Sequence, residues 1–283
     1  MGNGIAHSFA QYQNSVLLFD TNSVALSKSI QQISANLERQ ITKGSISESD
    51  KETILSNITP TQDLEEACKQ CDIAIEAVPE SIEIKKEVFQ LLDRYCRPEV
   101  ILASNTSSIS ITKLGGFTKR PDKVIGMHFM NPVPIMTLVE IIAGLKTSQA
   151  TIDTIQELST QIHKIPVCTK DYPGFISNRI LMPMINEAIY SYYEGVAGIS
   201  EIDQIMKLGM AHPMGPLQLA DYIGLDVCLN IMNVLYDGFK NPKYAPCPLL
   251  VNMVQAGLLG SKSHMGFYDW TEPKNLKVNY TLK

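Results

Sequence analysis

Short apolar runs alternate with amphipathic stretches over the first two-thirds of the chain. Residues 15–20 predict a buried strand, and residues 22–44 predict a helix because Leu26, Ile30, Ile33, Leu37 and Ile41 recur at spacings of three and four. Further strands are predicted over 72–78, 100–103, 123–129 and 137–143, and helices over 83–92 and 148–163. Continuous apolar strands separated by helices indicate a doubly wound α/β fold, with a parallel sheet covered on both faces.

The pattern changes after Asp171-Tyr172-Pro173-Gly174. Helices are predicted over 175–195, 199–208, 217–239 and 248–256, with little strand signal. We therefore place a domain boundary near residue 170, between an α/β domain over residues 1–170 and an all-helical domain over residues 171–283. Apolar helix faces rich in Met, Ile and Tyr indicate that the helical domain forms a homodimer, although core packing explains them nearly as well.

Composition narrows the class of protein. A chain of 283 residues with 45% hydrophobic and 19% charged residues is typical of a soluble protein with two domains. The net charge of -5 and the lack of a Lys/Arg run argue against a nucleic-acid partner. No apolar run approaches the ~20 residues of a membrane span, and no secretory leader is visible, so we expect a cytoplasmic protein without a membrane partner.

Six scattered cysteines are typical of a reduced, intracellular protein. Cys68 and Cys71 have the C-x-x-C spacing of redox and zinc sites. However, no second Cys or His pair stands at metal-ligand spacing around them, so we expect no metal site.

Two polar residues interrupt neighbouring apolar runs, His128 within 124–129 and Glu140 within 138–142. If the intervening Asn131-Pro132-Val133-Pro134 forms a hairpin turn, its midpoint is residue 134, and His128 then faces Glu140 across two strands. An imidazole keeps a buried carboxylate ionised, and the carboxylate orients the imidazole and raises its basicity. The pair suits general-base catalysis, and a structural ion pair is the alternative.

Asp20 ends a predicted strand directly before a helix, where a Rossmann-like fold places the acid that binds the adenosine ribose of NAD. Counting back ~20 residues leads to Met1–Ala6, in which only the last glycine of G-x-G-x-x-G is present, as Gly2. The preceding strand, which is central in this fold, is missing from the chain. We expect unpaired backbone and an apolar slot between its neighbours, unless the segment is an N-terminal helix of another α/β fold.

Ordered motifs from residue 1 to Trp270 resemble the 3-hydroxyacyl-CoA dehydrogenase family, most closely its short bacterial members that act on 3-hydroxybutyryl-CoA. Met1–Ala6 resembles the helix start that follows the family's glycine turn, and Gly126–Pro134 (GMHFMNPVP) matches its most specific signature. The other matching segments are 75–80 (IEAVPE), 103–108 (ASNTSS), 170–179 (KDYPGFISNR), 212–216 (HPMGP) and 260–268.

The resemblance implies oxidation of an L-3-hydroxyacyl-CoA at C3, with hydride transfer to NAD. It assigns His128 as the base that takes the hydroxyl proton and Glu140 as the group that orients His128. It assigns Asn178 to substrate positioning. Ser107 is expected to bind the C3 oxygen near the nicotinamide, or else to be a simple turn serine.

The resemblance also suggests cofactor and substrate contacts. Lys43 matches a lysine that meets the CoA phosphates in relatives, although a lysine at a helix C-terminus is also favoured by the helix dipole. Lys85 and Lys262 match cofactor contacts but could equally be solvated surface lysines. The full set of expected cofactor contacts is Gly2, Asp20, Glu80, Lys85, Asn105, Ser107, Asn131 and Lys262.

Two hypotheses remain open. The first is an NAD-dependent dehydrogenase whose opening strand precedes the residues of this chain. The second is a truncated, catalytically impaired relative that binds CoA thioesters or forms oligomers while keeping His128 and Glu140. We prefer the first.

Overall fold

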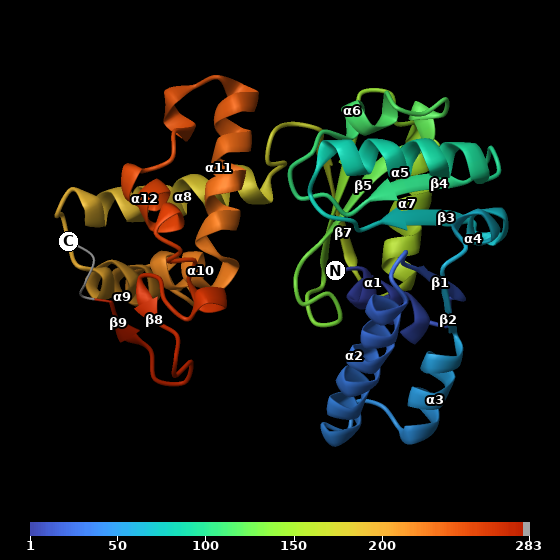
Figure 1. Ribbon diagram of the computed structural model, residues 1–283, viewed down its shortest axis with the longest axis horizontal. Coiled ribbons are helices and arrows are strands. Elements are labelled where there is room, and N and C mark those ends of the chain that lie inside the picture. Colours follow the sequence, from blue (N-terminus) through green and yellow to red (C-terminus); the bar gives the residue numbers. More distant parts are fainter. Residues whose placement is uncertain (280–283) are drawn as a thin grey trace. The chain divides into compact units, whose positions relative to one another are not determined.

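The computed structural model describes residues 1–279 and consists of two compact units, Met1–Tyr172 and Pro173–Lys283 (Figure 1). The break between the units lies close to the position predicted near residue 170. The first unit alternates strands and helices, and the second is mainly helical.

The strands of the first unit form two sheets. β1 (Val16–Phe19) pairs in parallel with β2 (Ile58–Thr61). The second sheet has the order β3-β4-β5-β6-β7. Its strands are β3 (Ile73–Glu76), β4 (Ile101–Ser104), β5 (Val124–Phe129), β6 (Leu138–Ala143) and β7 (Ile165–Lys170). Among the described residues no strand pairs with both β1 and β3. The two sheets are therefore separate, and the separation lies where the sequence analysis expected a slot between two neighbouring strands.

The second sheet is mostly parallel, as predicted, and it contains the one antiparallel pair that the predicted hairpin implies. β5 and β6 are antiparallel, whereas the other neighbouring strands are parallel. The cause is the short proline segment between β5 and β6, because a parallel connection needs a crossover of a dozen or more residues.

Seven α-helices belong to the described first unit. Figure 1 shows α2 and α3 lying side by side next to β1 and β2. The side chain of Asn22 begins α2 by accepting hydrogen bonds from the amides of Val24 and Ala25. The helices are α1 (Gly2–Gln11), α2 (Ser23–Thr42), α3 (Glu48–Ser56), α4 (Leu64–Gln70), α5 (Ile82–Tyr95), α6 (Ile111–Gly115) and α7 (Gln149–Gln161).

α1 packs against the core of the first unit and against the β5–β6 turn. Ile5 and Phe9 of α1 are buried with Met127 and Phe129 of β5. A Cβ on Gly4 would lie 3.0 Å from the Cβ of Val133, so the helix approaches this turn closely. The packing brings the start of the chain next to the strand that carries His128.

The second unit contains five α-helices and a small antiparallel sheet among its described residues, so the prediction of an all-helical domain was incomplete. The helix predicted over 217–239 is two helices that meet at Gly224 with a bend of 97°. The elements are α8 (Ser177–Tyr193), α9 (Ile199–Gly209), α10 (Pro216–Ile223), α11 (Leu225–Phe239), α12 (Pro248–Gln255), β8 (Tyr268–Asp269) and β9 (Lys277–Val278).

Within residues 1–279, no single helix has the length and apolar composition of a membrane span. Only the bent pair of α10 and α11, taken together, meets that test.

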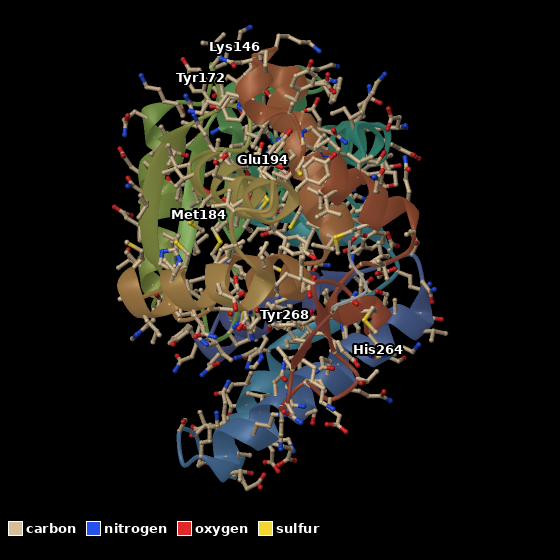
Figure 2. The ribbon with its side chains drawn as sticks, turned by 90° about the vertical axis from the view of Figure 1, so that its left-hand side faces the viewer. Lys146, Tyr172, Met184, Glu194, His264 and Tyr268 are labelled. Atoms are coloured by element: carbon tan, nitrogen blue, oxygen red, sulfur yellow. The ribbon has the colours of Figure 1, made fainter. Side chains whose placement is uncertain are left out.

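Two buried carboxylates attach the C-terminal segment to the helices of the second unit. Asp221 accepts hydrogen bonds from the amides of Phe267 and Tyr268 and from the indole of Trp270. Asp203 accepts one, of 2.8 Å, from the hydroxyl of Tyr268, which Figure 2 labels. Burial raises the pKa of Asp221 to about 6 and also raises the pKa of Asp203.

Candidate active site

His128 and Glu140 form a buried pair in the first unit. They stand directly opposite each other in the β5–β6 register, so their side chains leave the same face of the sheet. The distance between His128 Nδ1 and Glu140 Oε2 is 3.2 Å. Both residues are buried. The predicted register and contact are confirmed.

The geometry determines how this imidazole can act. With Nδ1 facing the carboxylate, the neutral ring carries its proton on Nδ1, and Nε2 is the nitrogen that can take up a second proton. The resulting imidazolium would lie against Glu140, whose negative charge stabilises it. The pair is therefore suited to move a proton to and from a neighbouring oxygen.

The loop after β4 carries Asn105 and Ser107 and lies beside the end of β5. The side-chain oxygen of Asn105 accepts a hydrogen bond of 2.9 Å from the amide of Phe129, the residue after His128. The amide of Asn105 donates to the carbonyl of Glu76 at 2.8 Å. The ends of β3, β4 and β5 thus meet at one edge, where ligands bind in open α/β sheets.

Glu80 fastens this loop. Its Oε1 accepts hydrogen bonds from the hydroxyl of Thr106, the amide of Ser107, and both the amide and hydroxyl of Ser108. Burial raises the pKa of Glu80, but the Thr106 hydroxyl, the charge of Lys85 and the Ser108 hydroxyl outweigh it, and the pKa lies below its ordinary value. Glu80 is therefore an ionised anchor.

Lys85 does not lie on the surface, and the interpretation of it as a solvated lysine was wrong. It is 1% exposed, and its ammonium lies 2.7 Å from Glu76 Oε1 and 3.4 Å from Glu80 Oε2. The ammonium is buried with the carboxylate of Glu76, because an unpaired charge would be costly there, and it also faces the partly exposed carboxylate of Glu80. The position of Lys85 indicates that its positive charge stabilises the ionised carboxylate of Glu80.

The two residues expected to bind the dinucleotide, Asp20 and Gly2, lie directly after β1 and at the start of α1. Asp20 follows β1 and is half-buried, and its Oδ1 accepts a hydrogen bond of 2.8 Å from the amide of Asn22. Gly2 begins α1, and a Cβ there would lie 3.8 Å from that of Ala77, just after β3. α1 has no side-chain cap and no acid in its first turn, which leaves its positive end suited to a phosphate.

The remaining expected contacts of the first unit are exposed. Asn131 lies in the turn after β5. Lys43 is the C-cap of α2, a helix of 20 residues and thus about 30 Å long. Lys43 therefore lies far from Asp20, which precedes the same helix. Only a long ligand reaches both ends of α2.

Asn178 and Lys262 belong to the second unit, and their place at the site stays a prediction. Asn178 is the second residue of α8, is buried, and is not the helix cap. The ammonium of Lys262 lies 2.5 Å from Asp226 Oδ1, so Lys262 is an ion-paired lysine.

Sequence reasoning did not assign roles to three groups that the structure places around the site. Glu76 and Ser104 end β3 and β4, and the Ser104 hydroxyl donates to Glu76 at 2.7 Å. Lys164 is buried, and its ammonium donates to the carbonyls of Val133 and Met136 in the β5–β6 turn. The available signal was polar residues at the ends of apolar strands.

The two thiols of the C-x-x-C segment, Cys68 and Cys71, lie near the thiol of Cys96. Cys71 Sγ is 4.0 Å from Cys96 Sγ, and all six cysteines are free. Within residues 1–279, no group of three or more His, Cys, Asp or Glu residues is arranged to hold a metal ion.

Family models match both units of the chain. The model described as 3-hydroxyacyl-CoA dehydrogenase, NAD binding domain, matches residues 1–172. The model described as 3-hydroxyacyl-CoA dehydrogenase, C-terminal domain, matches residues 174–270. Together they cover nearly the whole chain.

Individual relatives are similar over the same length. The chain is 51% identical to the probable 3-hydroxybutyryl-CoA dehydrogenase of Bacillus subtilis, over 96% of this chain and 94% of that protein. It is 52% identical to the 3-hydroxybutyryl-CoA dehydrogenase of Clostridioides difficile, over 96% of both chains. The crystal structure of (S)-3-hydroxybutyryl-CoA dehydrogenase from Ralstonia eutropha has a TM-score of 0.94 and 46% identity, over 96% of both chains. The chain belongs to the 3-hydroxyacyl-CoA dehydrogenase family.

Proposed function

We propose that this chain oxidises an L-3-hydroxyacyl-CoA to the 3-ketoacyl-CoA with NAD, and catalyses the reverse reaction. The preferred substrate is 3-hydroxybutyryl-CoA, the substrate in the names of the relatives from Clostridioides difficile and Ralstonia eutropha. The observation that carries the proposal is the buried pair of His128 and Glu140, at 3.2 Å, beside the carboxyl ends of β3 and β4.

The residues at this edge fit NAD. The uncapped start of α1 at Gly2 suits the pyrophosphate, and the carboxylate of Asp20 suits the adenosine ribose. Asn105 and Asn131 flank the end of β5 and would hold the nicotinamide end. When bound, NAD supplies the acceptor for the hydride that leaves C3.

His128 moves the proton of the reaction. In oxidation its Nε2 takes the proton from the C3 hydroxyl, and the electron pair left on oxygen forms the carbonyl as hydride leaves C3. Glu140 holds Nδ1–H and stabilises the imidazolium. In reduction the imidazolium returns the proton to the C3 oxygen. Ser107 donates a hydrogen bond to that oxygen, and Asn178 orients the thioester.

Lys43 would hold the phosphates of CoA. It is exposed at the far end of α2, about 30 Å along the helix from Ser23, where α2 begins. A CoA thioester is long enough for its acyl end to lie at His128 while its phosphates remain at a distant cation.

A second candidate function is thioester binding without turnover. The observation that favours it is the division between β1 and β3, because Asp20 and the His128 strand then belong to different sheets. Such a protein would bind acetoacetyl-CoA but bind NADH weakly.

An assay of NADH consumption with acetoacetyl-CoA tests the proposal. The 283-residue chain is compared with a chain that carries an added N-terminal strand ending in Gly-x-Gly. Turnover by either chain supports the dehydrogenase. If both chains bind acetoacetyl-CoA but neither oxidises NADH, the binding function holds instead.

A further inference from the structure

We infer that Glu76 and Lys85 are positioning residues, which fix the backbone around Ser107 by holding Glu80 in place. The inference deepens the proposed function, since the chemical role of Ser107 belongs to that proposal. The contacts that carry it lie entirely within the first unit.

The first step is the attachment of the loop to Glu80. A single oxygen, Oε1, accepts the amide of Ser107 at 3.0 Å and the amide of Ser108 at 2.9 Å. It also accepts the hydroxyls of Thr106 at 2.5 Å and Ser108 at 2.8 Å. Hydrogen bonds to a carboxylate are roughly twice as strong as neutral ones, so the loop conformation depends on this oxygen.

The second step is the attachment of Glu80 to Lys85. The other oxygen of Glu80, Oε2, lies 3.4 Å from the Lys85 ammonium. That ammonium is fully buried and lies closer to Glu76, at 2.7 Å. Lys85 thus supplies the positive charge that lets two carboxylates approach each other beneath the loop. Without it, the carboxylate of Glu80, which is 39% exposed, would be repelled by that of Glu76.

The third step is the attachment of Glu76 to the sheet. Its Oε1 accepts the amide of Val78, and its Oε2 accepts the hydroxyl of Ser104, each at 2.7 Å. Ser104 in turn accepts the amide of Thr106 at 3.2 Å. The network therefore begins and ends on β4 and the loop that follows it, and the side chains of Glu76, Lys85 and Glu80 connect its two ends.

The network reaches the proposed base through Asn105, which bonds to the amide of Phe129. Ser107 and His128 are then held at fixed positions by neighbouring parts of one loop. Because a misplacement of about 1 Å can cost about 100-fold in rate, the network affects turnover by fixing the position of Ser107.

Three variants separate positioning from folding. Lys85→Met removes the ammonium and keeps the length of the side chain. Lys85→Met combined with Glu76→Gln also neutralises the carboxylate that the first change leaves buried. Asp93→Asn is the control, because Asp93 lies 2.9 Å from Arg120 in a less deeply buried ion pair of the same unit.

We expect Lys85→Met to lower both Tm and kcat, the latter by about 100-fold. The double variant should recover Tm but keep the low kcat, with little change in KM for acetoacetyl-CoA. Asp93→Asn should lower Tm and leave kcat unchanged. If the double variant recovers kcat as well, or if Asp93→Asn lowers kcat equally, the pair is merely structural and the inference is wrong.

Hydrogen exchange tests the same inference without activity. The amides of Ser107 and Ser108 should exchange faster in Glu80→Ala and in the double variant, but not in Asp93→Asn. Glu80→Gln, which keeps an oxygen acceptor, should restore part of the protection lost in Glu80→Ala. Unchanged exchange in the double variant overturns the inference. If the variants show this exchange pattern but the wild-type chain has no turnover, only the proposed function is contradicted.

Discussion

Several buried charged residues of the first unit face an opposite charge, whereas the buried ammonium of Lys164 donates to two carbonyls. Glu140 lies against His128, and Glu76 and Glu80 lie against Lys85. Removing one member of such a pair leaves an uncompensated charge and typically costs 3–5 kcal/mol. Substitutions at these residues therefore need isosteric replacements and a separate measurement of folding.

His128→Gln tests the proposed base. Glutamine keeps the polar volume but cannot take up a proton at neutral pH, so kcat should fall by about 10²–10⁴-fold. NADH binding, followed by fluorescence, should be unchanged, since the substitution leaves the proposed cofactor contacts in place. Near-normal turnover in a folded His128→Gln protein would remove His128 from its role.

His7 should make the first unit sensitive to acid. Burial, and then the charge of Lys164, lowers the pKa of His7 from 6.5 to about 4. The unfolded chain binds a proton below pH 6.5 and the folded chain does not, so the free energy of unfolding falls as pH drops from 6.5 to 4. The loss is about 3 kcal/mol.

Chemical denaturation at several pH values measures this loss. His7→Phe should be less sensitive to pH over the same range, because phenylalanine does not titrate. An equal slope in the wild type and in His7→Phe would show that other groups are responsible.

The contacts of a single residue could be predicted only where a local pattern, such as a turn with a defined midpoint, fixed its partner. His128 and Glu140 were paired from the sequence because the turn between them has a defined midpoint. The burial of Lys85 was not predictable, since lysine is almost always exposed and Glu76 lies on a preceding strand. Lys85 is buried because α5 packs close to the end of β3, and no local sequence pattern indicates this packing.

At the level of elements, one glycine divides the long helical pattern of the second unit. Gly224 has φ +105° and connects α10 to α11. A Cβ there would lie 2.5 Å from the Cε of Lys262. The backbone conformation therefore favours glycine, and a Cβ would also displace the end of the Lys262 side chain.

Gly224→Ala should lower the free energy of unfolding by about 1–3 kcal/mol. The matched control is Gly209→Ala at the end of α9, where the Cβ would meet nothing within 4 Å. That control should stabilise the protein by about 0.4–1 kcal/mol. Urea unfolding measures both changes, and a similar shift in the two variants would contradict the strain at Gly224.

Element prediction succeeded where periodicity was long or symmetric and failed where it was short. α2 was predicted almost to its ends, and the β5–β6 hairpin was predicted in register. β2 was not predicted because its four residues include Pro60, which is rare in strands. The bend at Gly224 was not predicted because its neighbours continue the apolar helical pattern on both sides.

At the level of the whole molecule, the two units should respond to pH in opposite directions. Acid destabilises the first unit through His7. In the second unit burial raises the pKa of Asp221 from 3.8 to about 6. The folded second unit keeps that proton while the unfolded chain has lost it, so the second unit loses stability as pH rises from about 4 to 6.

Scanning calorimetry between pH 6.5 and 4 should therefore show two transitions moving in opposite directions as pH is lowered. Asp221→Asn should remove part of the shift of the second transition, although its amide must face one of the three donors that the carboxylate accepts. Two transitions that fall together with acid would contradict this assignment.

The predicted homodimer stays a proposal, and exposed apolar side chains on and after α9 support it. Ile205, Leu208 and Met210 are 60%, 83% and 62% exposed. Leu208→Glu should convert a protein of twice the chain mass into one of the single-chain mass, as measured by light scattering. Leu145→Glu, at an 84% exposed leucine of the first unit, is the control and should leave the mass unchanged.

The depth of Lys85 has a practical consequence. Reagents that acylate amines modify lysines at the surface, and Lys85 is enclosed between two acids. Its labelling, read by mass spectrometry, would then report each brief opening of the structure around it.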